Sequence, residues 1–198
     1  MANYDRKDRF YQMAKEQGKR SRAFFKLKEL NQHFAFIYPG AKILDLGAWP
    51  GSWLEYSSAV VNSHGKVVGI DLQEIEPLPK KNVHLITGDV RDQENIDQAI
   101  EFAGGLFDAV ISDMSPSLTG IREVDSWAAR SLAELAFFTC ESALRPEGTL
   151  VIKVFKSSEI DQFYRSIQKR FERLIRKELK STRKTSNEFY IIGKGFKK

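Results

Sequence analysis

The stretch Lys42–Trp53, KILDLGAWPGSW, decides the fold assignment because it joins an apolar run to a turn that contains two glycines and a proline. A short apolar run, followed by such a turn and then by a helical pattern over 51–62, predicts a buried strand and a crossover helix. Helical patterns over 92–103 and 125–144 then separate further apolar runs, at KVVGID, VHLIT, LFDAVISD and TLVIKVF. This alternation predicts an α/β protein with a mostly parallel sheet and helices on both faces.

The two ends of the chain add further elements to this prediction. The segment RSRAFFKLKELNQHF carries an apolar stripe at helical spacing and is expected to pack on the sheet as a leading helix, with Phe24, Leu27, Leu30 and Phe34 facing it. Ser158 and Asp161 form a capping-box pattern that is expected to open another helix, whose apolar stripe continues to Phe171. The run FYIIG, from Phe189, is expected to be the last strand.

Length and composition limit the class of protein. With 198 residues, 42% of them hydrophobic and 29% charged, we expect a single domain over 1–198, in which 1–35 form a basic helical extension. No apolar stretch reaches the roughly 18 residues that span a bilayer, and the polar start MANYDRKDRF lacks the apolar centre of a signal peptide. We therefore expect a cytoplasmic monomer without a membrane partner. The single cysteine, Cys140, excludes an internal disulfide, and the spacing typical of a metal site is absent.

The positive charge is concentrated at the two ends of the chain. Residues 1–28 carry a net charge of +6 and residues 165–198 carry +9, whereas residues 29–164 carry −10. Two basic ends around an acidic centre favour a polyanion as the partner. Because few aromatic residues accompany these lysines and arginines, contacts with the backbone of a structured RNA are expected. The alternative is that they are ordinary solvated side chains on terminal helices.

The glycine turn indicates the kind of cofactor. Gly47 and Gly51 permit backbone angles and a close approach that side chains would prevent. The turn lacks the third glycine of a dinucleotide site, and Pro50 removes a backbone N–H that a phosphate would need. A cofactor without phosphates, S-adenosylmethionine, is therefore predicted, and a nicotinamide oxidoreductase is disfavoured. If the turn served only as a link, its tryptophans Trp49 and Trp53 would be unexplained.

Acidic residues follow three of the predicted strands. Asp71 comes about 20 residues after the glycine turn, where such folds place a carboxylate that accepts from ribose hydroxyls. Asp89 and Asp113 follow the next two runs. Asp89 alone is more simply explained as a turn residue. Together the three carboxylates predict an adenosyl site at one edge of the sheet.

Lys153 interrupts the run TLVIKVF, which otherwise has the composition of a strand buried on both faces. A buried ammonium is costly unless it is paired, so a partner is expected. The predicted topology offers Asp113 at the end of the neighbouring strand and Glu188 at the start of the last one, with Lys26 on the leading helix. The alternative is that Lys153 lies near the strand end and extends to water.

Six motifs lie along nearly the whole chain: SRAFFKL, LDLGAWPGSW, GDVRD, SDMSPSLTG, LRPEGTLVIKVF and SNEFYIIG. With them the sequence resembles the FtsJ-like (heat-shock ribosomal RNA) 2′-O-ribose methyltransferases. This resemblance implies a Rossmann-like S-adenosylmethionine-dependent methyltransferase fold, with a mostly parallel seven-stranded sheet and an antiparallel last strand. It implies a catalytic tetrad formed by Lys26, Asp113, Lys153 and Glu188. It also implies cofactor contacts at Gly51, Trp53, Asp71, Asp89 and Asp113.

The resemblance also implies a substrate, a ribose of large-subunit ribosomal RNA, for which we expect a uridine. Transfer RNA is the alternative substrate, and an inactive RNA-binding protein is the alternative function. Trp49 stands where the family usually has a small residue, and Ser117 replaces a common asparagine. Neither change removes a tetrad member, so activity is expected to be retained.

The chemistry that the tetrad would perform leaves two roles open for Lys153. Methyl transfer needs alignment and the removal of a proton from a weakly acidic ribose hydroxyl, so a neutral Lys153 could act as the base. A charged Lys153 would instead orient the hydroxyl and stabilise the developing oxyanion. Methylation at the five position of a pyrimidine would need a thiolate, and Cys140 lies within a helical pattern, away from the strand ends.

Overall fold

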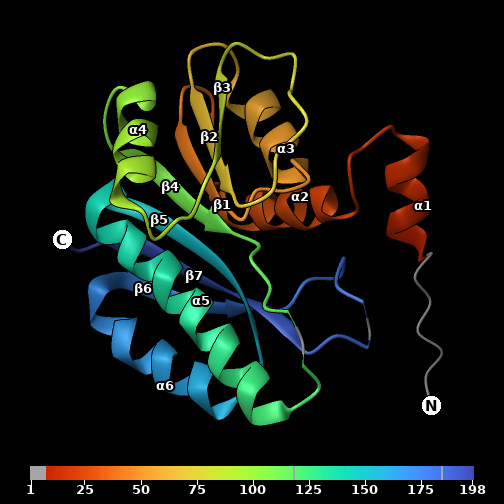
Figure 1. Cartoon of the computed structure of the whole chain (residues 1–198), viewed down its shortest axis with the longest axis vertical. Coiled ribbons are helices and arrows are strands. Elements are labelled where there is room, and N and C mark those ends of the chain that lie inside the picture. The colour runs from red at the N-terminus through yellow and green to blue at the C-terminus, as the bar shows by residue number, and fades with distance from the viewer. Residues whose placement is uncertain (1–7, 118, 184) are drawn as a thin grey trace.

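Seven strands form one sheet in the computed structural model of the chain, which describes residues 8–117, 119–183 and 185–198. Their order across the sheet is β3-β2-β1-β4-β5-β7-β6 (Figure 1). The strands are β1 (Lys42–Leu46), β2 (Lys66–Asp71), β3 (Val83–Thr87), β4 (Phe107–Ser112), β5 (Leu144–Phe155), β6 (Phe171–Lys177) and β7 (Glu188–Phe196). The first five are mutually parallel, whereas β7 is antiparallel to both β5 and β6. The predicted α/β class and the antiparallel last strand are confirmed.

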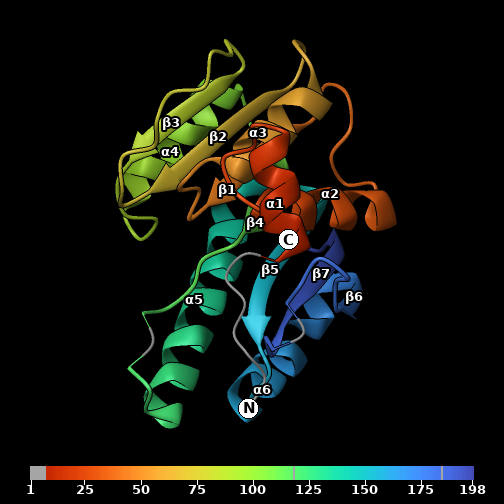
Figure 2. The ribbon, with the colours of Figure 1, turned by 90° about the vertical axis from the view of Figure 1, so that its right-hand side faces the viewer.

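Helices cover both faces of this sheet. They are α1 (Arg9–Glu16), α2 (Ala23–Phe34), α3 (Ser52–Val61), α4 (Gln93–Ala103), α5 (Arg122–Ala143) and α6 (Ser158–Ile167), followed by the 3-10 turn η1 (Gln168–Arg170). One apolar cluster packs α2 and α3 against the first face, and a second packs α4, α5 and α6 against the opposite face. Figure 2 shows α1 outside these layers, next to α2. None of the helices in the described part of the chain is both long and apolar enough to cross a membrane.

The buried face of the leading helix, α2, differs slightly from the predicted one. Leu27 and Leu30 are buried as expected, but the buried phenylalanine is Phe25 rather than Phe24. The ring of Phe25 lies 5.8 Å from that of Phe10 on α1, a helix that the sequence pattern did not define. Phe24 instead contacts Tyr56 of α3 edge to face, at 5.4 Å. The face of α2 is therefore set by two helices that pack on either side of it.

The predictions for the helix after β5 need two corrections. Its N-cap is Ser157, whose hydroxyl accepts from the Ile160 N–H at 3.3 Å, so the expected capping box at Ser158 is wrong. The helix ends at Ile167, and Phe171 is not part of its stripe but the first residue of β6. The ring of Phe171 packs 5.4 Å from that of Phe196 in β7. Strand pairing therefore overrides the helical spacing of the apolar residues.

Candidate active site

Lys153 and Asp113 form an ion pair between neighbouring strands. In the parallel ladder of β4 and β5, Ser112 lies beside Ile152, so the next residue on each strand is one of this pair. The Lys153 Nζ lies 3.2 Å from the Asp113 Oδ1 and donates to the Asp113 backbone oxygen at 2.5 Å. The Lys153 side chain is only 7% exposed. It is therefore paired within the protein and does not extend to water.

Tyr190 is part of this arrangement, although it was not singled out in the sequence. It lies directly opposite Lys153 in the antiparallel ladder of β5 and β7, and its hydroxyl donates to the Asp113 Oδ1 at 3.2 Å. Its complete burial, followed by the nearby charges of Asp113 and Glu188, raises the pKa of the Tyr190 hydroxyl well above its ordinary value. The hydroxyl therefore remains protonated and serves as a donor.

Lys26 and Glu188 form a second ion pair on the same face of the sheet. Their charged atoms lie 2.6 Å apart, and the two side chains are 12% and 10% exposed. Because side chains alternate along β7, Glu188 shares the face of Tyr190, onto which α2 brings Lys26. Thr182 donates to the Glu188 Oε1 at 2.9 Å. The structure thus brings the four residues of the predicted tetrad together as two ion pairs.

A cavity of about 820 Å³ lies at the carboxyl ends of β1, β2 and β4. Of the predicted cofactor contacts, its lining includes Gly47, Asp71, Asp89 and Asp113. Gly47 has a φ of +72°, and a Cβ there would lie 2.4 Å from the Met114 Cγ, so this position requires glycine. Trp49, half of whose surface is exposed, lines the same cavity.

The acidic residues of this cavity are held in place. Asp71 accepts from the Trp49 N–H at 2.9 Å and from the Gln73 N–H at 2.8 Å, which fixes the carboxylate at the end of β2. Hydrogen bonds from the Arg91 side chain and backbone lower the pKa of Asp89, so its carboxylate is ionised. Two carboxylates beside apolar surface suit a ligand with hydroxyl and amino groups and a flat ring. These acceptors therefore fit the adenosyl group of S-adenosylmethionine.

Gly51 and Trp53 do not line this cavity. Gly51 caps α3 with a φ of +99°, and a Cβ there would lie 2.6 Å from the Arg20 Nη1. Trp53 is 3% exposed, and its indole N–H donates to the Ala23 oxygen at 3.0 Å. In this structure both residues shape the turn and its packing against α2. A direct contact of either one with the cofactor stays a prediction.

Asp45, inside β1, was also missed by the sequence analysis. It is 1% exposed, and neither of its carboxyl oxygens has a hydrogen-bond partner. Burial, reinforced by the charges of Asp113 and Asp71, raises its pKa well above the ordinary value. In the sequence, Asp45 is visible only as a charged residue that interrupts a short apolar run. The protein thus holds a carboxyl group that resists ionisation beneath the predicted cofactor site.

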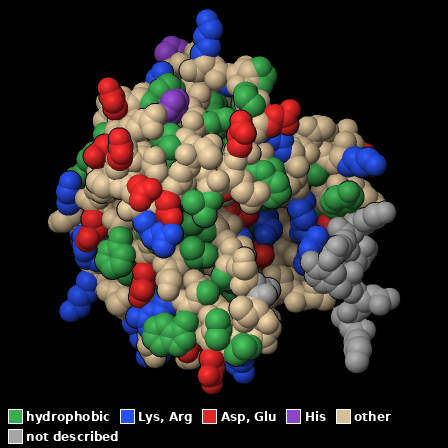
Figure 3. Space-filling view, in the orientation of Figure 1, with side chains coloured by type: hydrophobic (Ala, Val, Ile, Leu, Met, Phe, Trp, Pro, Cys, Tyr) green, Lys and Arg blue, Asp and Glu red, His purple; other side chains and the backbone are tan. Residues whose placement is uncertain are grey.

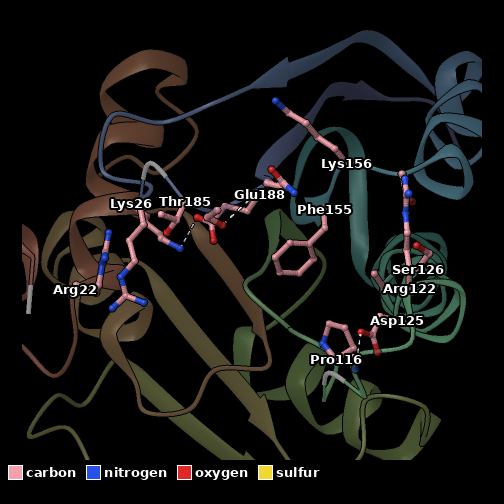
Figure 4. Close-up of a pocket in the computed structure, with 16 residues that line it drawn as sticks. Arg22, Lys26, Pro116, Arg122, Asp125, Ser126, Phe155, Lys156, Thr185 and Glu188 are labelled. Carbon is pink, nitrogen blue, oxygen red and sulfur yellow. Dashed lines mark hydrogen bonds and ion pairs between the residues drawn. The ribbon is translucent and has the colours of Figure 1, made fainter. Parts of the chain in front are cut away.

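A second cavity, of about 740 Å³, lies beyond the segment that follows β4. Met114 and Ser115 line the first cavity and Pro116 lines the second, whereas Ser117 is exposed and lines neither. The second cavity is bordered by the Lys26–Glu188 pair and by further charged and aromatic side chains, including Arg22, Arg122, Phe155, Lys156 and Arg183 (Figure 4). Asp113 therefore lines the first cavity and the Lys26–Glu188 pair lines the second, whereas the buried Lys153 lines neither.

The two basic ends of the chain meet at this second cavity. Arg22 donates to the Asp8 carboxylate and to the Ser181 backbone oxygen, and Arg183 lies 3.3 Å from the same carboxylate. Glu29 of α2 accepts from the Ser181 N–H at 2.9 Å, which holds the segment between β6 and β7 against the helix. Figure 3 shows Lys and Arg side chains in the hollow between the body of the molecule and α1. Basic residues from both ends of the chain, Arg22 and Lys26 from the first and Arg183 from the second, therefore line this cavity.

An open, mostly parallel sheet with an acidic cavity at its strand ends defines a Rossmann-like nucleoside-binding fold, which in this chain carries the methyltransferase motifs. A family model described as FtsJ-like methyltransferase matches residues 19–196. The chain belongs to this family of methyltransferases, which confirms the predicted class of enzyme and its cofactor, S-adenosylmethionine.

Relatives with curated names agree with this assignment. Proteins named ribosomal RNA large subunit methyltransferase E are 39% identical to the chain in both Methanococcus aeolicus and Methanothermobacter thermautotrophicus. The first match covers 96% of this chain and 70% of the relative. The second covers 97% of this chain and 91% of the relative. Among solved structures, a putative ribosomal RNA methyltransferase from Plasmodium falciparum has a TM-score of 0.78 at 25% identity, over 89% of this chain and 98% of that one. Aeropyrum pernix fibrillarin, solved with bound S-adenosylmethionine, has the same fold, with a TM-score of 0.61 at 15% identity. This match covers 85% of this chain and 74% of that one.

Proposed function

We propose that the protein transfers a methyl group from S-adenosylmethionine to a ribose 2′-hydroxyl of large-subunit ribosomal RNA. The observation that carries this proposal is the arrangement of two ion pairs: Asp113 of the Lys153–Asp113 pair lines a cavity that fits the cofactor, and the Lys26–Glu188 pair lines a cavity with a basic rim. The names of the curated relatives support ribosomal RNA as the substrate.

S-Adenosylmethionine, when bound, supplies a methyl group on a positively charged sulfur. Asp71 and Asp89 would hold the adenosyl group by accepting hydrogen bonds from its hydroxyl and amino groups. The protein then has to align the ribose hydroxyl and manage its proton. Lys153 is the residue that we assign to this proton, because Asp113 holds its Nζ through two contacts.

The two states of Lys153 would act differently on the hydroxyl. As a neutral amine it accepts the proton, and as an ammonium it orients the oxygen and stabilises the charge that develops there. Asp113 positions Lys153 in both cases, and Tyr190 positions Asp113. Lys26, oriented by Glu188, would hold the ribose or an adjacent phosphate.

The target nucleotide, the oligomeric state, the cellular location and the class of RNA are expectations that experiments can test. We expect a uridine as the target and a cytoplasmic monomer as the active form. Transfer RNA is the alternative substrate. A purely RNA-binding role is disfavoured because all four residues of the predicted tetrad are present and paired.

A tritiated-methyl assay tests the proposal when intact large ribosomal subunits, naked ribosomal RNA and transfer RNA are offered side by side. We expect label in large-subunit RNA and its loss in Lys153→Ala, while S-adenosylmethionine affinity, measured by calorimetry, changes by less than about threefold. Lys66→Ala is the matched control, because Lys66 lies at the start of β2 and lines neither of these cavities. Label only in transfer RNA would replace the substrate, and full turnover by Lys153→Ala would refute the role of this lysine.

A further inference from the structure

Phe155 occupies an unusual position for an aromatic residue near the end of a central strand. It lies two residues after Lys153 on β5, so both side chains are on the same face of the strand. Phe155 is half-buried, yet it is part of neither of the two apolar clusters that form the core. Among the described residues its ring has no aromatic contact. In Figure 4 the ring points into the second cavity, between Glu188 and Pro116.

The charged side chains around this ring favour an anionic ligand. In Figure 4, Arg22 and Lys26 lie on one side of Phe155, and Arg122 lies on the other. Within the described ranges of the chain, the lining contains five Lys and Arg side chains and two acidic ones, Asp125 and Glu188. Glu188 is paired with Lys26, and Asp125 accepts from the Thr119 N–H at 2.8 Å and the Gly120 N–H at 3.2 Å. Although Arg22 is paired with Asp8, Lys26 with Glu188 and Lys156 with Glu178, basic side chains outnumber acidic ones in this lining and surround one aromatic surface.

A nucleotide within an RNA chain matches this lining, because it has a phosphate on each side for the basic side chains and a flat base for the aromatic ring. The volume of about 740 Å³ lies within the range of about 300–1,000 Å³ typical of sites for molecules of this size. Residues two apart on a strand are about 6.6 Å from each other, so Lys153 and Phe155 are close enough to contact the ribose and the base of one nucleotide. A ribose placed at Lys153 would therefore bring its base to Phe155.

We infer that the second cavity receives the target nucleotide turned out of the RNA, with its base stacked on Phe155 while its ribose faces Lys153. This inference rests on the proposed function and identifies the substrate contact of the same site. Enzymes that modify a nucleotide within a structured nucleic acid commonly extrude it into a pocket and stack its base on an aromatic side chain. Stacking accepts every base, so Phe155 sets the position of the nucleotide and not its identity.

The test compares Phe155→Leu, which removes the ring and keeps an apolar side chain, with Phe155→Tyr, which keeps the ring. Single-turnover methylation is measured with large ribosomal subunits from a strain that lacks this protein. We expect Phe155→Leu to lower the rate about 10-fold or more and Phe155→Tyr to stay within about threefold of the wild type. S-Adenosylmethionine affinity should be unchanged in both. Phe102→Leu is the control, since Phe102 is a half-buried ring on α4 that lines neither cavity.

A fluorescence measurement tests the same contact without chemistry, and it applies even if Phe155→Leu proves unstable. Phe155→Trp should show additional quenching on addition of the RNA, compared with the wild type and its own tryptophans. Three results would each overturn the inference. The first is a wild-type rate in Phe155→Leu, the second is an equal loss of rate in Phe155→Leu and Phe155→Tyr, and the third is the absence of additional quenching in Phe155→Trp. If the wild type itself transfers no methyl group, the proposed function fails instead.

Discussion

The Lys26–Glu188 ion pair allows the structural and the chemical roles of the predicted tetrad to be separated by a double-mutant cycle. At 2.6 Å, two unit charges attract each other by about 6 kcal/mol at an effective dielectric constant of about 20, and the loss of hydration cancels much of this. Both side chains are about nine-tenths buried, so removing either one leaves the other charge buried and unpaired. We expect Lys26→Met and Glu188→Gln each to lower the free energy of unfolding by about 3 kcal/mol.

In the double variant no unpaired charge remains, and most of the lost stability should return. The expected coupling free energy is about 2 kcal/mol or more, and each single variant should melt roughly 6–12 °C below the wild type for a chain of this size. Urea unfolding and thermal melting measure the stability, and the tritiated-methyl assay measures the activity. We expect the double variant to recover stability but no methyl transfer. Additive losses, within about 0.5 kcal/mol, would show that the two charges are uncoupled, and an active double variant would show that the pair is only structural.

Three further predictions concern residues around the same site. Tyr190→Phe removes the hydroxyl that donates to Asp113 at 3.2 Å, and it should lower single-turnover methylation about 10-fold while costing only about 1 kcal/mol of stability in urea unfolding; an unchanged rate would contradict the positioning role. Trp49→Ala removes a half-exposed ring from the cofactor cavity, so calorimetry should show S-adenosylmethionine bound several-fold more weakly, whereas Trp127→Ala, an exposed tryptophan that lines neither cavity, should leave it unchanged. Burial raises the pKa of Asp45, so the stability that its protonated form contributes is fully present below about pH 4 and is lost as the pH rises toward the raised pKa. Asp45→Asn should therefore melt above the wild type at pH 8 and converge with it near pH 4, and equal melting temperatures at pH 8 would exclude an ionisation cost.

Much of the fold could be predicted because the central strands are buried on both faces. The strands β1, β2 and β4 are almost entirely buried, and their apolar residues stand out between helical patterns without knowledge of their neighbours. The same property made Lys153 conspicuous, since a charge in such a strand demands a partner. The partner itself, Asp113, followed from the topology, because the carboxyl ends of parallel neighbours meet at one edge.

The elements that escaped prediction depend on contacts between distant parts of the chain. The edge strand β6 has a mostly exposed or half-exposed surface and carries Arg173 and Arg176, so it lacks the pattern of a buried strand. It forms because β7 pairs with it along its length. Tyr190 gave no signal for a similar reason. Its role depends on the register that places it opposite Lys153, and register is invisible in a single strand.

That register also explains how Asp113 links the cofactor cavity to Lys153. Asp113 lines the cofactor cavity, yet its backbone oxygen and carboxylate hold Lys153, and Tyr190 fixes the same carboxylate from β7. A shift of β5 by one residue would turn Lys153 to the opposite face of the sheet, among the apolar residues that pack against α5 and α6, and away from the Lys26–Glu188 pair. The insertion of β7 between β5 and β6 therefore does more than extend the sheet. It holds β5, which carries Lys153, between β4 and β7, and so fixes the face of the sheet on which the cofactor and the target ribose can meet.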